Sequence, residues 1–207
     1  MLLMNSSDSL DLKKTPPVPY DFGKRIPTVD EIQELLEAWN FPEGIRQHCI
    51  VVKDIALQIA DRIKETNPDL ELDLSVVEAG ALLHDIGRIK SHGLEHGYIG
   101  GLLLREINVD ERVVRCAMVH VLGGFTPDDI KQEFPANLKD VIHDSLIPES
   151  IEEKIVCYAD KHAEGVIQVN LKKRFSRWFK KHGKTPFLLK SRYRLLQIEK
   201  DIKQVML

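Results

Sequence analysis

The sequence predicts an all-α fold, a compact helical bundle. Apolar residues recur along most of the chain at the three- and four-residue spacings of amphipathic helices, and the alternating pattern of β-strands is nearly absent. Ser or Thr followed three residues later by Glu, a pattern typical of helix starts, precedes three apolar runs. With 207 residues, of which 43% are hydrophobic and 29% charged, the chain can bury one sizeable core.

The three capping patterns begin at Thr28, Ser75 and Ser150. In each, the hydroxyl and the carboxylate satisfy backbone amides that the start of a helix leaves without partners. The helix from Ser75 is expected to end near Gly87, in the left-handed conformation typical of a C-cap. The helix from Ser150 is expected to cover residues 151–171.

Helices over residues 44–64, 97–106 and 110–121 complete the predicted core. In the longest of them, Ile55 and Ile59 belong to an apolar stripe along one face, which predicts that this face packs inward. The bundle is therefore built from several helices of ordinary length joined by short connections.

Residues 121–149 are expected to be irregular. Two consecutive glycines and three prolines interrupt any long helix there, although Thr126 precedes a proline that favours the first turn of a short one. An irregular segment of this length is typical of a functional flap or of a disordered loop. The Gly123-Gly124 turn either joins two helices or forms a loop on the substrate side.

The two ends of the chain differ from its centre. Residues 1–26 are rich in Ser, Lys and Pro, which predicts a flexible N-terminal extension. Residues 27–171 form the predicted domain, and residues 172–207 form a basic helical extension packed on it. From residue 165 to the end there are 12 Lys and Arg and two Asp and Glu, and this excess suggests an anionic partner.

The aromatic residues of the basic extension allow two interpretations. Cations with interleaved aromatic rings can form a surface that binds RNA or a nucleotide. Alternatively, the aromatic side chains pack on the domain while the charges stay solvated. The helical spacing of Phe175, Trp178 and Phe179 favours the second interpretation.

The composition also indicates where the protein works. No apolar run is long enough to span a bilayer, and the first residues lack the basic and apolar regions of a secretory signal. Cys49, Cys116 and Cys157 lie in apolar helical patterns without a CxxC pair, which predicts reduced, buried thiols in a cytoplasmic protein. We expect no membrane partner; a homodimer is compatible with the sequence but not required by it.

His84 and Asp85 are the most prominent candidates for chemistry, because they end an almost wholly apolar helix. A buried imidazole and carboxylate are costly unless they are paired or bind a metal. Four further candidates lie along the chain: His48, His96, His120 and Asp160. This set offers nitrogen and oxygen but no thiolate, which suits Mn, Fe, Co, Ni, Mg or Zn and argues against a structural zinc site.

The order His48, His84-Asp85 and Asp160 resembles the defining pattern of the HD superfamily of metal-dependent phosphohydrolases, in which His-Asp-Ile-Gly is a common variant. The resemblance covers residues 27–165 and implies the helical bundle of the HD domain. Residues 81–101 are similar to small archaeal and bacterial proteins of this type and to symmetrical dinucleoside tetraphosphate hydrolases. The chain lacks the HHE and GYP elements of cyclic-di-GMP phosphodiesterases, and it is shorter than the deoxynucleotide triphosphohydrolases.

The resemblance implies a site for one or two divalent transition-metal ions. The first ion would be held by His48, His84, Asp85 and Asp160. Asp85 would bridge to a second ion, and His96 and His120 would complete the ligand set of that ion. Alternatively, His96 and His120 are buried structural histidines, or they contact the substrate in an enzyme that holds one metal ion.

Several remaining residues are expected to lie near the site or on the surface. His92 is a substrate contact, an exposed residue or a further metal ligand. Three other histidines are predicted to be surface or structural residues: His143, His162 and His182.

The implied reaction is hydrolysis of a phosphate ester or anhydride, expected to be that of a nucleotide, by metal-activated water. Besides Asp85, the predicted catalytic residues are Arg88 and Lys90, which follow the motif and are placed to contact phosphate. Lys161 and Arg46 are weaker candidates for the same role. The alternatives are a di-iron oxygenase, a chemistry that some two-metal HD proteins perform, and a non-catalytic metal-containing module that binds RNA.

Overall fold

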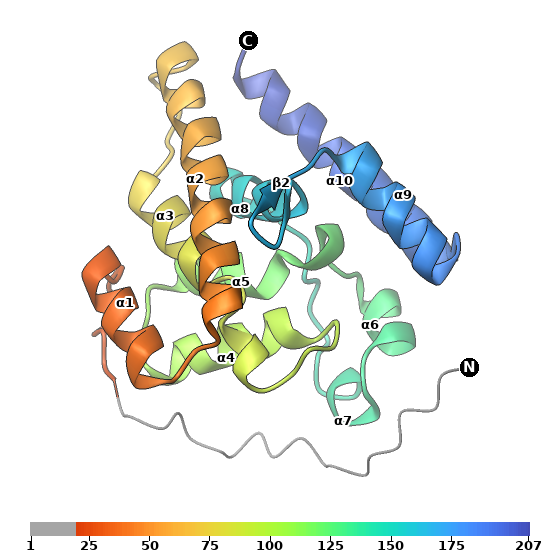
Figure 1. The fold of residues 1–207 in the computed structure, drawn as a ribbon, viewed down its shortest axis with the longest axis horizontal. Coiled ribbons are helices and arrows are strands. Elements are labelled where there is room, and N and C mark those ends of the chain that lie inside the picture. The colour runs from red at the N-terminus through yellow and green to blue at the C-terminus, as the bar shows by residue number, and fades with distance from the viewer. Residues whose placement is uncertain (1–19) are drawn as a thin grey trace.

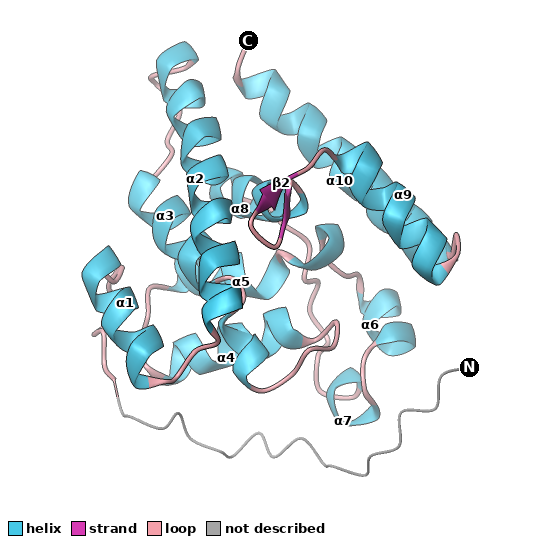
Figure 2. Ribbon diagram, in the orientation of Figure 1, coloured by secondary structure: helices cyan, strands magenta, loops and turns pink. Residues whose placement is uncertain are grey.

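Figure 1 shows the computed structural model of the protein, which describes residues 20–207. Within this part the chain is helical apart from one small β-hairpin, which confirms the predicted all-α fold (Figure 2). The flexible extension was predicted for residues 1–26, most of which lie outside the described residues. No helix among residues 20–207 is both long and apolar enough to cross a membrane.

The helical elements follow one another with short connections. The α-helices of the described part are α1 (Val29–Ala38), α2 (Glu43–Thr66), α3 (Leu74–Leu83), α4 (His96–Glu106), α5 (Glu111–Val119), α6 (Pro127–Glu133), α7 (Ala136–Lys139), α8 (Ile151–Lys161), α9 (Leu171–His182) and α10 (Pro186–Val205). Two 3-10 helices extend α3 and α5: η1 (Ile86–Ile89) and η2 (Val121–Gly123). An antiparallel hairpin follows α8: β1 (Ala163–Glu164) and β2 (Ile167–Gln168).

Helix α3 packs against four other helices: α1, α2, α5 and α8. It is apolar nearly all round, as a helix buried on every side must be. Helix α4 packs on α5 and η1, and α10 packs on α8 and η2. The C-terminal end of α3, which carries His84 and Asp85, therefore opens into the interior of the bundle.

Two of the three predicted caps are present where the sequence places them. The Thr28 hydroxyl accepts a hydrogen bond from the Glu31 amide, and the Glu31 carboxylate accepts one from the Thr28 amide. Ser150 caps α8 in the same way with its hydroxyl. The start predicted at Ser75 is wrong, because Asp73 is the N-cap and its carboxylate accepts from the Ser75 amide at 3.0 Å.

The chain from residue 20 to 25 is docked on the bundle, so the predicted extension ends earlier than residue 26. The Phe22 ring is buried, and its amide donates to the carbonyl of Ile107 at 2.9 Å. The amide of Asp110 donates to the carbonyl of Arg25 at 3.0 Å. Burial of one aromatic ring and backbone pairing with the α4–α5 connection hold this segment.

Two further segments differ from the prediction. The helix expected over 151–171 ends at Lys161, and Gly165, with φ 58°, lies in the turn of the hairpin that follows. Residues 121–149 are not a disordered loop, because the short helix predicted after Thr126 forms as α6, α7 follows it, and the two bury Ile130 and Leu138.

Gly87 is required for a close helix contact and not for a left-handed cap. Its φ is not positive, and it lies within η1. A Cβ atom at this position would lie 2.0 Å from the carbonyl oxygen of His96 and 2.6 Å from the amide nitrogen of Gly100. The missing side chain lets η1 lie directly against α4, which carries His96.

We expect Gly87→Ala to destabilise the protein by about 3 kcal/mol, because the methyl group forces η1 and α4 apart. The matched control is Gly44→Ala in the first turn of α2, where a Cβ would meet no atom within 4 Å. That change should leave the stability unchanged or raise it by up to about 1 kcal/mol. Urea unfolding of both variants tests this, and equal effects would contradict the packing role of Gly87.

Candidate metal centre

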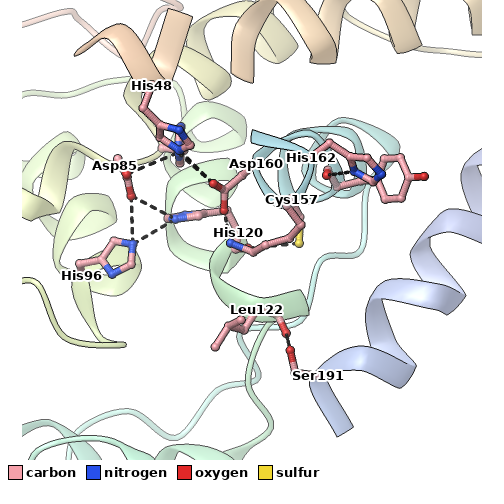
Figure 3. Close-up of polar contacts among 12 residues, drawn as sticks. His48, Asp85, His96, His120, Leu122, Cys157, Asp160, His162 and Ser191 are labelled. Carbon is pink, nitrogen blue, oxygen red and sulfur yellow. Dashed lines mark hydrogen bonds and ion pairs between the residues drawn. The ribbon is translucent and has the colours of Figure 1, made fainter. Parts of the chain in front are cut away.

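The six residues predicted as metal ligands meet at one place in the bundle (Figure 3). They come from the interior of α2, the end of α3, the start of α4, the end of α5 and the last turn of α8. The residues are His48, His84, Asp85, His96, His120 and Asp160. All but His48 are fully buried, and each of them ends or begins a helix whose apolar face packs in the core.

The backbone sets the tautomer of the histidine rings. The Nδ1 atoms of His84, His96 and His120 lie 2.7, 2.6 and 2.8 Å from the carbonyl oxygen three residues earlier. Nδ1 of His48 lies 3.0 Å from the carbonyl oxygen of Gly165. A carbonyl oxygen only accepts hydrogen bonds, so each Nδ1 donates and each neutral ring presents an Nε2 lone pair to the centre.

These lone pairs lack suitable protein partners. Nε2 of His96 lies 3.1 Å from Nε2 of His120, and two lone pairs at this distance repel each other. Nε2 of His84 is buried without a hydrogen bond. Nε2 of His48 lies 3.1 Å from Oδ1 of Asp160; burial opposes protonation of this imidazole, but the carboxylate outweighs burial and raises its pKa, so a proton or a cation can fill this contact. A metal cation fits this arrangement, because it would turn each of these contacts into a ligand bond.

The two carboxylates of the centre are ionised. Burial by itself would raise the pKa of Asp85, but the facing imidazoles, His84 first, hold that pKa well below its usual range. Burial opposes ionisation of Asp160 in the same way, and the adjacent Lys161 ammonium holds its pKa well below the usual range. The cluster therefore supplies two negative charges to a cation.

The buried imidazoles are neutral. Burial lowers the pKa of His84 and lowers that of His120 to about 3. Neutral imidazole and ionised carboxylate are the forms that bind metal ions. His84, His120 and the two carboxylates are thus in the required protonation state at neutral pH.

Asp85 lies between two groups of ligands. Its Oδ1 is 3.0 Å from Nε2 of His96 and 3.5 Å from Nε2 of His120, whereas its Oδ2 is 3.7 Å from Nε2 of His84. One group of mutually close ligand atoms contains His48, His84 and Asp85, and another contains Asp85, His96 and His120. A third group joins His84, His120 and Asp160. One carboxylate oxygen faces each of the first two groups, as a bridging ligand requires.

The loop after His120 is held in a strained conformation. Leu122 has φ 52°, which is unfavourable for a residue with a side chain. The Ser191 hydroxyl of α10 donates to the Leu122 carbonyl at 2.6 Å, and the Cys157 thiol of α8 donates to the His120 carbonyl at 3.2 Å (Figure 3). Two helices thus fix the backbone on which His120 lies. All three cysteines are buried and free, as predicted.

Of the four cationic residues predicted to contact phosphate, two line the cavity beside the cluster. Nε of Arg88 donates to Oδ2 of Asp85 at 2.7 Å, and Lys161 forms an ion pair with Asp160. Lys90 follows η1 and is not part of the described cavity lining. Arg46 pairs with Glu37 of α1 and Glu43 of α2. The catalytic role of Lys90 stays a prediction.

A cavity of about 870 Å³ opens above the cluster. His92 is exposed and lines it, so this histidine lies at the mouth and not among the converging ligands. Three further residues that line the cavity, all on α9, are not among the predicted site residues: Arg174, Trp178 and His182. Their spacing of four residues is the signal for a common helix face, but it does not say that this face points toward the site.

The fold and the buried His/Asp cluster define a helical domain with a candidate metal centre. The family model of the HD domain matches residues 45–165, and the chain belongs to this family. The chain is 35% identical over 143 residues to an uncharacterized protein of Methanocaldococcus jannaschii, covering 69% of this chain and 79% of that protein.

Two further relatives carry the name tRNA (cytidine(56)-2′-O)-methyltransferase. The one from Picrophilus torridus is 34% identical over 168 residues, and the one from Thermoplasma volcanium is 33% identical over 167 residues. The matches cover 80% and 79% of this chain but 46% and 45% of those proteins, so the chain spans less than half of their length. No solved structure matches the chain.

Proposed function

We propose that the protein is a metal-dependent phosphohydrolase that cleaves a phosphate ester or anhydride of a nucleotide. The observation that carries the proposal is the convergence of four imidazole Nε2 atoms and two ionised carboxylates below a cavity. Membership of the HD domain family, with its resemblance to metal-dependent phosphohydrolases, supports it further.

The residues of the chain have separate tasks in this reaction. His48, His84, Asp85 and Asp160 would hold one ion, and Asp85, His96 and His120 would hold a second. When bound, the ions supply a hydroxide-like water near neutral pH and neutralise charge on the phosphoryl oxygens.

Two cations of the cavity wall assist the phosphate group. Arg88 orients Asp85 through their ion pair and lines the cavity, where its guanidinium would contact the phosphate. Lys161 keeps Asp160 ionised and adds positive charge where the phosphoryl oxygens would lie.

We expect removal of bound metal to lower phosphate release from nucleoside monophosphates by at least about 100-fold. The protein is dialysed against a chelator, assayed, and then reloaded separately with Mn, Fe, Co, Ni, Zn and Mg. Recovery of the rate with at least one of these ions is the expected result. A rate unaffected by chelation, or no phosphate release with any ion, would contradict the proposal. Bound iron without phosphate release would favour the di-iron oxygenase.

RNA binding is a second candidate function, because two relatives are named tRNA methyltransferases. Four lysines of α9 are exposed and available to phosphates: Lys172, Lys173, Lys180 and Lys181. This candidate predicts salt-dependent binding of RNA without turnover. The reloading assay above separates it from the phosphohydrolase.

A further inference from the structure

We infer that the inner face of α9 forms the nucleoside-binding wall of the site, with Arg174 contacting a substrate phosphate and Trp178 stacking on the base. This inference rests on the proposed function and assigns its substrate class, a nucleoside monophosphate. Helix α9 lies outside the residues that match the HD domain, 45–165. The wall would therefore be an addition of this chain to the domain.

Helix α9 is anchored so that one stripe of side chains faces the cavity. Leu171 and Phe175 are buried against the bundle, while Arg174 and Trp178 line the cavity. Phe175 supports the indole of Trp178 edge to face, with ring centroids 5.0 Å apart. Contact with Phe175 thus restricts the tryptophan ring before any ligand binds, which lowers the entropic cost of stacking.

Arg174 is a buried cation whose guanidinium is incompletely paired. Only 16% of its side chain is exposed, and its Nε is buried without a hydrogen bond. The nearest carboxylate oxygen, on Glu164, is 4.0 Å from its Nη1, and Glu164 forms its close ion pair with Arg177 instead. Burying a guanidinium without partners costs free energy, and a phosphate group can supply two parallel hydrogen bonds.

Arg174 and the metal centre face the same cavity, which Asp85, Arg88 and Asp160 also line. Burial lowers the pKa of Arg174, the carboxylates of Asp160 and Asp85 act against this, and Arg88 adds to it. The guanidinium therefore lies within electrostatic reach of the cluster and of the other cavity arginine. A phosphate between Arg88 and Arg174 would relieve their repulsion and would lie beside the metal ligands.

The position of Trp178 suits the base of a nucleotide whose phosphate binds Arg174. The guanidinium carbon of Arg174 lies over the indole ring, 5.0 Å from its centre, so the cation covers one face of the ring and a base would stack on the other face. A phosphate on the arginine would leave the sugar and base to extend along α9 over the indole. A cavity of about 870 Å³ has room for a mononucleotide.

Trp178 fluorescence tests the stacking directly, because the chain contains two tryptophans and the other, Trp39, is buried in the core. In the metal-loaded Trp39→Phe variant, Trp178 is the sole indole. We expect adenosine 5′-monothiophosphate, a slowly hydrolysed analogue, to quench this emission, and ribose 5-phosphate, which has no base, to compete without comparable quenching.

Steady-state kinetics give the second measurement. Trp178→Ala should raise KM for AMP about tenfold and leave KM for ribose 5-phosphate unchanged, because stacking involves only the base. Arg174→Gln should lower kcat/KM for both substrates by at least about tenfold, since both carry the phosphate. Arg192→Gln is the charge-matched control on the exposed face of α10 and should change neither.

The outcomes separate this inference from the proposed function. Hydrolysis of both substrates with no quenching and equal KM values in Trp178→Ala would overturn the nucleoside wall and leave the phosphohydrolase intact. Quenching by the thiophosphate without hydrolysis of any phosphate would support the wall and contradict the phosphohydrolase.

Discussion

Replacing Asp85 with asparagine is expected to remove the bound metal and lower phosphate release by at least about 1,000-fold. Asparagine keeps the size of the side chain but removes its charge. The carboxylate oxygens of Asp85 face His96 and His120 on one side and His84 on the other, so both groups of ligands lose their shared anion. Its amide would also present a donor to Arg88, whose Nε now donates to Oδ2.

The metal content and the rate are both measured, by elemental analysis of the protein purified without chelator and by phosphate release. Asp129→Asn is the matched control, because Asp129 is equally buried but pairs with Arg194 and Lys190 of α10. We expect the control to lose stability and to keep its metal. Wild-type metal content in Asp85→Asn would rule out a bridging role for this carboxylate.

The members of the cluster were predictable because each one interrupts a strongly apolar pattern. His84 and Asp85 end a helix that is otherwise apolar, and His120 and Asp160 follow apolar helical stretches in the same way. Burial of an ionisable side chain is costly, so its position in such a pattern indicates a partner. The sequence does not reveal which of these residues lie close together in the fold. His48 and Asp160 are 112 residues apart and come together only through the packing of α2 on α8.

The errors concern features that depend on tertiary contacts. The position of Gly87 after a helix predicts a C-cap, but the contact that requires glycine is with α4, later in the chain. Arg174 lies in a basic segment whose charges were predicted to stay solvated. Its inward orientation follows from the burial of Leu171 and Phe175 and from the hairpin that turns the chain after α8. Neither contact leaves a local signal in the sequence.

The histidines of the second ligand group should control how many ions the protein retains. His96 shares close ligand atoms only with Asp85 and His120, whereas His120 also belongs to the group with His84 and Asp160. We therefore expect His96→Ala to lower the metal content from about two ions per chain to about one, and His120→Ala to lower it to one or fewer. Both changes should reduce phosphate release by at least about 100-fold.

Elemental analysis of the two variants is compared with that of His162→Ala, whose Nδ1 lies 2.9 Å from the carbonyl oxygen of Tyr158, away from the cluster (Figure 3). The control should retain the wild-type content. About one ion in the wild type, unchanged in His96→Ala but lost in Asp85→Asn, would instead make the centre mononuclear. His96 would then be a substrate contact in the cavity that it lines, with its Nε2 3.1 Å from Nε2 of His120.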